Sequence, residues 1–135
     1  MIIMHRLVPE FKGLQHRYGS SKVVAPKDLS WMKLMEFPLT PGQYNLRSCT
    51  VLIMIPHNYD LVCIRECYVD IDLRRVDAGG QLRKLPHVHT GYRYERDGYR
   101  WLCLESGYGE NSGLIGFIDI LRTYFTDPEG FNKVN

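Results

Sequence analysis

The chain has 135 residues, enough for one domain with its own core and too few for two. Apolar residues make up 44% of the composition and charged residues 24%, which is typical of a soluble globular protein and excludes intrinsic disorder. The formal net charge of +2 is too small to indicate nucleic-acid binding by itself.

The sequence carries no sign of a membrane span or a secretion signal. Its longest apolar run, Val51 to Pro56, is far shorter than the roughly 20 residues that cross a bilayer. The first residues, MIIMHR, lack the order of charge, apolar block and cleavage site that marks a signal peptide. We therefore expect a cytoplasmic protein with no membrane contact.

Four cysteines occur, at Cys49, Cys63, Cys67 and Cys103. Without a secretion signal, we expect them to be reduced thiols, with Cys49 and Cys63 acting as small buried hydrophobes. The spacing of Cys63 and Cys67 is not a usual zinc spacing, and no second cysteine pair follows. His57 nearby keeps a metal site open as a minority alternative, but we expect no metal and no cofactor.

The first predicted element is an amphipathic helix over residues 6–17 that covers a sheet. Its apolar residues are spaced i, i+4, i+7: Leu7, Phe11 and Leu14. Its basic residues fall on the other faces: Arg6, Lys12 and Arg17. Pro9 and Gly13 weaken this helix, and the Gly19 region ends it.

Three strands are predicted next, at residues 29–37, 46–55 and 65–73. The second begins with alternation and continues as an apolar run, which suits a central position in a sheet. Residues 38–45 form a turn-rich connector between the first two strands, and a turn follows the third at residues 77–80.

The second half of the chain is less regular. Residues 92–94 and 99–104 are expected to pair as a hairpin, because Asp97-Gly98 is the strongest local turn signal. A glycine-rich loop then leads to an apolar helix over residues 114–125, which ends before Pro128. The whole predicts a single α+β domain over residues 1–135, with an antiparallel meander of about three or four strands.

Six short motifs carry a resemblance to a known family. They are, in chain order, FPLTPGQYN, VLIMIPHNYD, YVDIDLRR, LPHVH, WLCLE and LIGFIDILRTYFTDP. In this order they resemble the ubiquitin-conjugating enzyme fold, above all the divergent bacterial relatives found in ubiquitin-like conjugation operons. LPHVH stands where that family has its His-Pro-Asn signature, and WLCLE where it has its active-site cysteine.

The resemblance has departures. The position of the family's asparagine is taken by His87, a replacement similar to the Pro-His-Val form of bacterial relatives. His87 and Cys103 are 16 residues apart rather than eight, because residues 92–101 are inserted. The longer relatives' two C-terminal helices are also missing from the sequence given.

The resemblance implies that Cys103 accepts a ubiquitin-like modifier as a thioester and passes it to a target amine. His87 or His89 would donate to the oxyanion or raise the thiolate fraction. Three residues beyond the cysteine are weaker candidates for handling the incoming amine: Glu105, Glu110 and Asn111.

The implied partners are an activating enzyme, a ubiquitin-like modifier and a target protein, in a bacterial pathway with an antiviral role. The family commonly meets its activating enzyme on the first helix, which selects Arg6, Lys12 and Arg17 as contacts. Two alternatives stay open. Cys103 can be a packed core residue of a non-catalytic scaffold, since free cysteine is among the most buried residue types. The Tyr- and Arg-rich residues 92–100 favour a protein contact over single-stranded nucleic acid.

Overall fold

The computed structural model describes residues 6–59, 64–104 and 113–131 of the chain. Within these residues it forms two α-helices, α1 (Leu7–Tyr18) and α2 (Gly113–Thr126), and one 3₁₀ turn, η1 (Glu95–Asp97). The strands are β1 (Val23–Val24), β2 (Trp31–Pro38), β3 (Ser48–Met54), β4 (Glu66–Asp70), β5 (Arg75–Val76), β6 (Leu82–Arg83), β7 (Val88–His89) and β8 (Tyr99–Leu102). The mixed α+β class is confirmed.

Six of these strands form one antiparallel sheet in the order β1-β2-β3-β4-β8-β7. The expectation of three or four strands was therefore wrong. The sheet is wider because β1 and β7 extend its two edges with only two residues each. Such short strands have too few residues to show an alternating pattern in the sequence.

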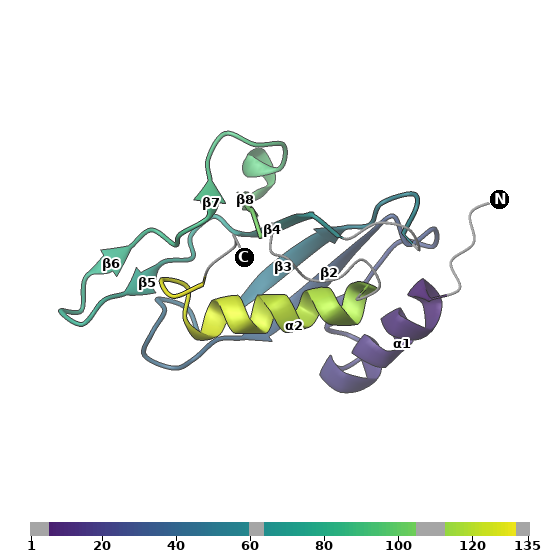
Figure 1. The fold of residues 1–135 in the computed structure, drawn as a ribbon, viewed down its shortest axis with the longest axis horizontal. Helices are drawn as coiled ribbons and strands as arrows, with labels where there is room; N and C mark the ends of the chain where they lie inside the picture. Colours follow the sequence, from purple (N-terminus) through teal and green to yellow (C-terminus); the bar gives the residue numbers. More distant parts are fainter. Residues whose placement is uncertain (1–5, 60–63, 105–112, 132–135) are drawn as a thin grey trace.

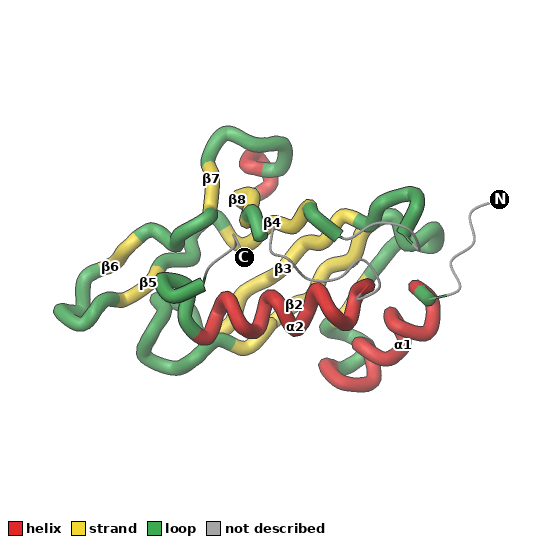
Figure 2. The backbone as a smooth tube through the Cα atoms, in the orientation of Figure 1, coloured by secondary structure: helices red, strands yellow, loops and turns green. Residues whose placement is uncertain are grey.

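Helix α2 lies across one face of this sheet, as Figures 1 and 2 show. Its core-facing residues are fully or almost fully buried: Leu114, Phe117, Ile118, Leu121, Tyr124 and Phe125. They meet the inward side chains of the strands, among them Met32, Ile53 and Cys67. The predicted second helix is confirmed.

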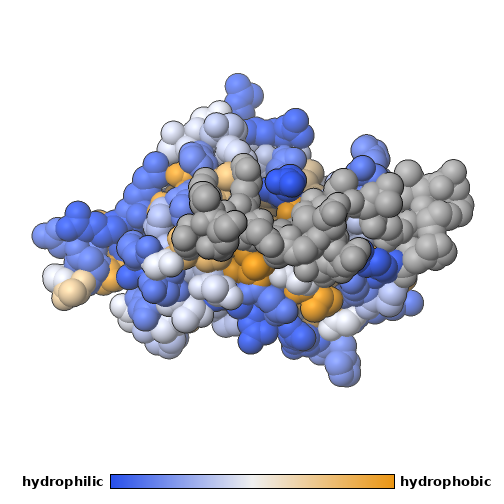
Figure 3. All heavy atoms as spheres, viewed as in Figure 1, coloured by the Kyte–Doolittle hydropathy of each residue, from blue (hydrophilic) through white to orange (hydrophobic). Residues whose placement is uncertain are grey.

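Helix α1 packs beside α2 and against the edge strand β1 of the sheet, and its buried residues Leu7 and Leu14 and the partly buried Phe11 belong to the core. This is the apolar stripe that the sequence predicts. None of the helices that the structure describes is long and apolar enough to span a membrane. On the face seen in Figure 3, hydrophilic residues cover most of the described surface and apolar residues show between them.

A two-stranded arm, β5 and β6, follows β4 and extends away from the main sheet (Figure 1). Its predicted turn is confirmed, because the Gly80 N–H donates to the Asp77 carbonyl at 2.9 Å. The root of the arm is held by Asn45, whose side-chain oxygen accepts from the Arg74 N–H at 2.7 Å.

The predicted hairpin of residues 92–94 with 99–104 was wrong. Strand β8 pairs instead with β4 and β7, while the residues before it form η1. The Glu95 carboxylate closes this excursion on itself, because it accepts from the Gly91 N–H and from Arg100. Gly98 ends η1 in the left-handed region, with φ of 94°, so the turn signal itself was placed correctly.

Candidate active site around Cys103

Cys103 follows directly after β8, at the point where β8 and β7 stop being paired. Its backbone N–H donates to the carbonyl oxygen of His87 at 2.9 Å. This hydrogen bond continues the register in which Val88 lies opposite Leu102. The Pro-His-Val and Trp-Leu-Cys motifs are therefore adjacent in space although 16 residues separate His87 from Cys103.

The side chain of Cys103 is largely covered, since only 3% of the residue is exposed. The neighbours in sequence, Leu102 and Leu104, are at 0% and 2%. A thioester carrier needs an accessible thiol, so carriage on Cys103 would require this conformation to open around the residue.

Cys49 and Cys67 are structural thiols. Cys49 is 2% exposed and Cys67 fully buried, so the expectation that Cys49 is a small core residue is confirmed. Burial raises the pKa of both thiols well above the ordinary value, which disfavours the reactive thiolate. The Cys67 thiol donates to the Leu102 carbonyl at 3.5 Å and so packs under β8. Cys63 lies outside the described residues.

The backbone carbonyl of His87 accepts from Cys103, while the His87 ring has partners of its own. The His87 ring packs against Tyr124 and Phe131, with centroids 6.2 and 6.0 Å away. Its Nε2 lies 3.5 Å from the Phe131 carbonyl oxygen. His87 also has a φ of 68°, in the left-handed region that side chains rarely adopt. The ring is thereby turned toward the C-terminal end of α2.

Tyr124 anchors the same segment, and the sequence interpretation missed this role. Its hydroxyl donates to the carbonyl oxygen of Pro86, the residue before His87. Burial raises the pKa of this hydroxyl, which therefore stays protonated and able to donate. The only signal in the sequence was the place of Tyr124 next to the core-facing stripe of its helix.

His89 faces a different environment from His87. It lies opposite Trp101 in the sheet, with the two ring centroids 5.1 Å apart, and 6.1 Å from Tyr92. Two histidines two residues apart would share one face of an extended segment, but His87 and His89 do not. The left-handed backbone at His87 interrupts the extended conformation that this would require.

The three loop candidates, Glu105, Glu110 and Asn111, lie outside the described residues. No group of three or more metal-ligating side chains is close enough to hold a metal ion within the described parts of the chain.

Arg6 corrects the expectation for the basic face of α1. Its side chain is only 28% exposed; the guanidinium lies 5.4 Å from the Tyr59 ring centroid and 3.8 Å from the Glu10 carboxylate. Arg6 is thus held inside a corner, whereas Lys12 and Arg17 are exposed as expected. The position of Arg6 is thus set by Tyr59, a residue that follows β3 in the sequence.

The same corner joins the beginnings of both helices. The buried Tyr59 hydroxyl donates to the Glu10 carboxylate and accepts from the Leu114 N–H. Gly113 permits this approach, because a Cβ on it would lie 2.7 Å from the Tyr59 hydroxyl oxygen. The first residues of α2 are therefore held in place by Tyr59 and Glu10.

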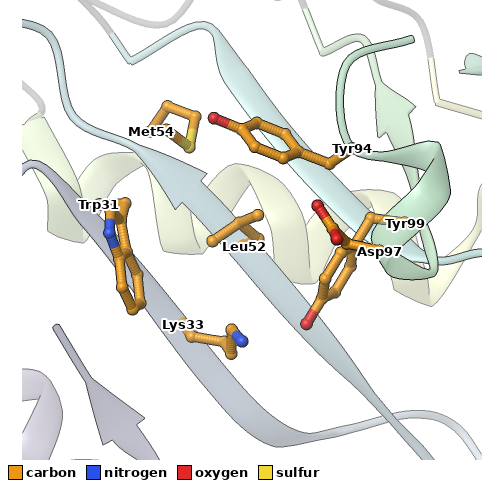
Figure 4. A pocket seen from close by; sticks show the side chains of 7 residues that line it. All are labelled: Trp31, Lys33, Leu52, Met54, Tyr94, Asp97 and Tyr99. Atoms are coloured by element: carbon orange, nitrogen blue, oxygen red, sulfur yellow. The ribbon is translucent and has the colours of Figure 1, made fainter.

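The face of the sheet opposite α2 carries an open groove of about 370 Å³ (Figure 4). Its lining residues are Trp31, Lys33, Leu52, Met54, Tyr94, Asp97 and Tyr99. The Lys33 ammonium lies between two rings, 5.8 Å from Trp31 and 5.6 Å from Tyr99. Residues of the inserted excursion thus help to line a second surface, separate from the Cys103 neighbourhood.

The strands of the main sheet and the segments around His87 and Cys103 lie within a match to a known protein family. The model of the prokaryotic E2 family E matches residues 11–103, which is more than half of the chain and ends at Cys103. Comparisons with curated proteins and with solved structures gave no match. The chain belongs to the prokaryotic E2 family E.

Proposed function

We propose that the protein is a transferase that carries a ubiquitin-like modifier as a thioester on Cys103. The observation that carries this proposal is the backbone hydrogen bond from Cys103 to His87, which joins the two motifs of the conjugating enzymes at one place. The activity is set in a bacterial conjugation pathway in the cytoplasm, with antiviral defence as its proposed purpose.

The reaction needs two exchanges at one sulfur. The Cys103 thiolate attacks the carbonyl carbon of the thioester between modifier and activating enzyme, and the thiolate of that enzyme leaves. A target amine then attacks the new thioester, loses its proton to a base or to water, and the Cys103 thiolate leaves. Both steps pass through a tetrahedral oxyanion that N–H donors stabilise. ATP is consumed by the activating enzyme, so this chain needs no cofactor for either exchange.

The strand geometry suits a carrier. Cys103 is attached to a paired strand on one side and precedes the glycine-rich part of the sequence on the other. Its backbone is fixed by the hydrogen bond to His87, so the sulfur is held on a rigid base.

The second candidate function is a non-catalytic scaffold that binds a modifier or partner protein. The 3% exposure of Cys103 favours it, because a packed cysteine forms no thioester. The ring of His87 lies against Phe131, which also removes one candidate oxyanion donor from this conformation.

One experiment separates the two functions. The protein is incubated with the activating enzyme and modifier of its own genome and ATP, and products are resolved with and without thiol reductant. A carrier gives an adduct that the reductant cleaves, that Cys103→Ala abolishes, and that the controls Cys49→Ala and Cys67→Ala retain. If wild-type protein binds the modifier but gives no such adduct, the scaffold function is correct.

A further inference from the structure

A groove of about 330 Å³ lies where the C-terminal ends of α1, β2 and α2 meet. We refer to it as the helix-end groove. Its lining residues are Arg17, Tyr18, Phe37, Pro38, Thr40, Arg122, Phe125 and Thr126. None of the residues in the Cys103 neighbourhood is among them.

The floor of the helix-end groove is aromatic. Phe37 stands between two other rings, with its centroid 5.9 Å from Tyr18 and 5.7 Å from Phe125. Phe37 and Phe125 are nearly buried, while Tyr18 is partly exposed and Pro38 exposed. A bound apolar side chain would therefore meet ring surface that is already fixed by the core.

The rim of the groove is positively charged. Arg17 comes from α1 and Arg122 from α2, and none of the described residues that line the groove is acidic. Arg17 makes no ion pair with any residue that the structure describes. Arg122 lies 4.0 Å from Asp119, but both side chains are about 60% exposed, and such a pair contributes little.

We propose that the helix-end groove binds an acidic segment of a partner protein that inserts one aromatic or branched apolar side chain. The apolar side chain packs on the aromatic floor, and the guanidinium groups donate paired hydrogen bonds to carboxylates. Because the two arginines come from two different helices that border one apolar floor, the segment places an acidic residue on each side of its apolar anchor. The proposal does not depend on thioester formation at Cys103.

Selection from random short peptides displayed on phage tests this directly. Peptides are selected on wild-type protein and then depleted on the Arg17→Glu/Arg122→Glu variant. We expect the remaining peptides to carry an aromatic or branched apolar residue flanked by Asp or Glu on both sides. Enriched peptides without this acidic pattern overturn the proposal, and so does the absence of any peptide that distinguishes the two proteins.

Fluorescence anisotropy with the selected peptide measures how much the arginines of the groove contribute to its affinity, compared with net charge alone. Arg17→Glu/Arg122→Glu should weaken binding at least about tenfold, since it replaces attraction by repulsion at both positions. The matched control Lys27→Glu/Lys84→Glu has the same change of net charge on exposed residues outside the groove and should stay within about twofold. Equal losses in both variants would mean that only net charge matters, and would overturn the groove as the site.

Competition experiments test whether other anions bind the helix-end groove in place of the peptide, and thermal unfolding tests whether the variants are folded. Inorganic phosphate and a single-stranded oligonucleotide are each added as competitors of the labelled peptide. If either competes as effectively as unlabelled peptide, the groove does not specifically recognise a protein segment. Replacement of the anchor by Ala in the peptide should weaken binding, and unchanged binding would refute the aromatic floor. Thermal unfolding should show that both double variants are folded, because all four substituted residues are exposed.

Discussion

The backbone N–H of Cys103 donates to the carbonyl oxygen of His87 across 2.9 Å. The hydrogen bond extends the pairing of β7 with β8 by one residue beyond the end of β8. It fixes the main chain of the cysteine while the His87 ring turns away to the end of α2. A substitution at His87 can therefore act through the backbone conformation as well as through the ring.

Alkylation should show that Cys103 is the most reactive of the three described cysteines in the folded protein. Cys49 and Cys67 lie within strands, and burial raises the pKa of each thiol. Cys103 lies just past the end of β8, and local opening at the end of a strand costs less free energy than opening within one. Site-resolved mass spectrometry after a short iodoacetamide pulse measures the order. A slower rate at Cys103 than at Cys67 would contradict the carrier function.

His87→Asn should be better tolerated than His87→Ala. Asn adopts the left-handed region more readily than most residues, and its amide is also a hydrogen-bond donor. We expect His87→Ala to cost about 1–2 kcal/mol, because it keeps the φ of 68° and loses the contacts with Tyr124 and Phe131. Urea unfolding gives both free energies.

The same pair of variants tests the ring in transfer. Discharge of the preformed thioester to free lysine should be slower in His87→Ala and recover in His87→Asn if a side-chain donor supports the oxyanion. Equal discharge rates in both variants and in wild type would show that His87 has a structural role alone.

Two glycines should respond to alanine in opposite directions. A Cβ on Gly13 of α1 meets nothing within 4 Å, so Gly13→Ala should stabilise the protein by about 0.5–1 kcal/mol. A Cβ on Gly113 would lie 2.7 Å from the Tyr59 hydroxyl oxygen, and its φ is +61°. Gly113→Ala should cost about 1–3 kcal/mol. Thermal unfolding of both variants measures the difference, and similar shifts would refute the close corner.

Arg6 and Lys12 should differ in stability although both are basic residues at the same helix. Arg6→Ala should cost about 1 kcal/mol, because it removes the guanidinium from the Tyr59 ring and the Glu10 carboxylate. Lys12→Ala should stay within about 0.5 kcal/mol, as expected of an exposed side chain. If Arg6→Ala proves as neutral as Lys12→Ala, the corner makes no contribution to folding.

We expect the contribution of Asp70 to the free energy of unfolding to fall as pH rises. Its pKa is raised mainly by burial, although the Thr50 N–H donates to its carboxylate at 2.9 Å. The folded state therefore holds the proton more tightly than the unfolded state does. The resulting stabilisation is fully present below the ordinary aspartate pKa of about 4 and is lost as pH rises through the higher folded pKa.

Asp70→Asn should remove this dependence, which unfolding free energies at a series of pH values around and above about 4 would show. Asp77→Asn is the control of opposite sign. Hydrogen bonds from Gln81, Arg83 and Gly79 lower the pKa of Asp77, so its contribution is present above about 4 and lost as pH falls. If the difference in unfolding free energy between wild type and Asp70→Asn does not change with pH, burial does not raise the pKa of this carboxylate.

The sequence by itself determined the elements that have enough residues to show a period. The stripe of Leu7, Phe11 and Leu14 predicted α1, and the apolar run from Val51 predicted the central strand β3. The order of the motifs also identified the family, because each motif is continuous in the chain.

Only the tertiary structure decided how these pieces meet. The two-residue strand β7 exists because β8 offers it a partner, and no local pattern encodes such a pairing. The ring of His87 is directed by Tyr124 and Phe131, which follow it by 37 and 44 residues. Arg6 is held by Tyr59 for the same reason. Propensity acts between neighbours in the chain, whereas side-chain direction is set by packing between distant segments.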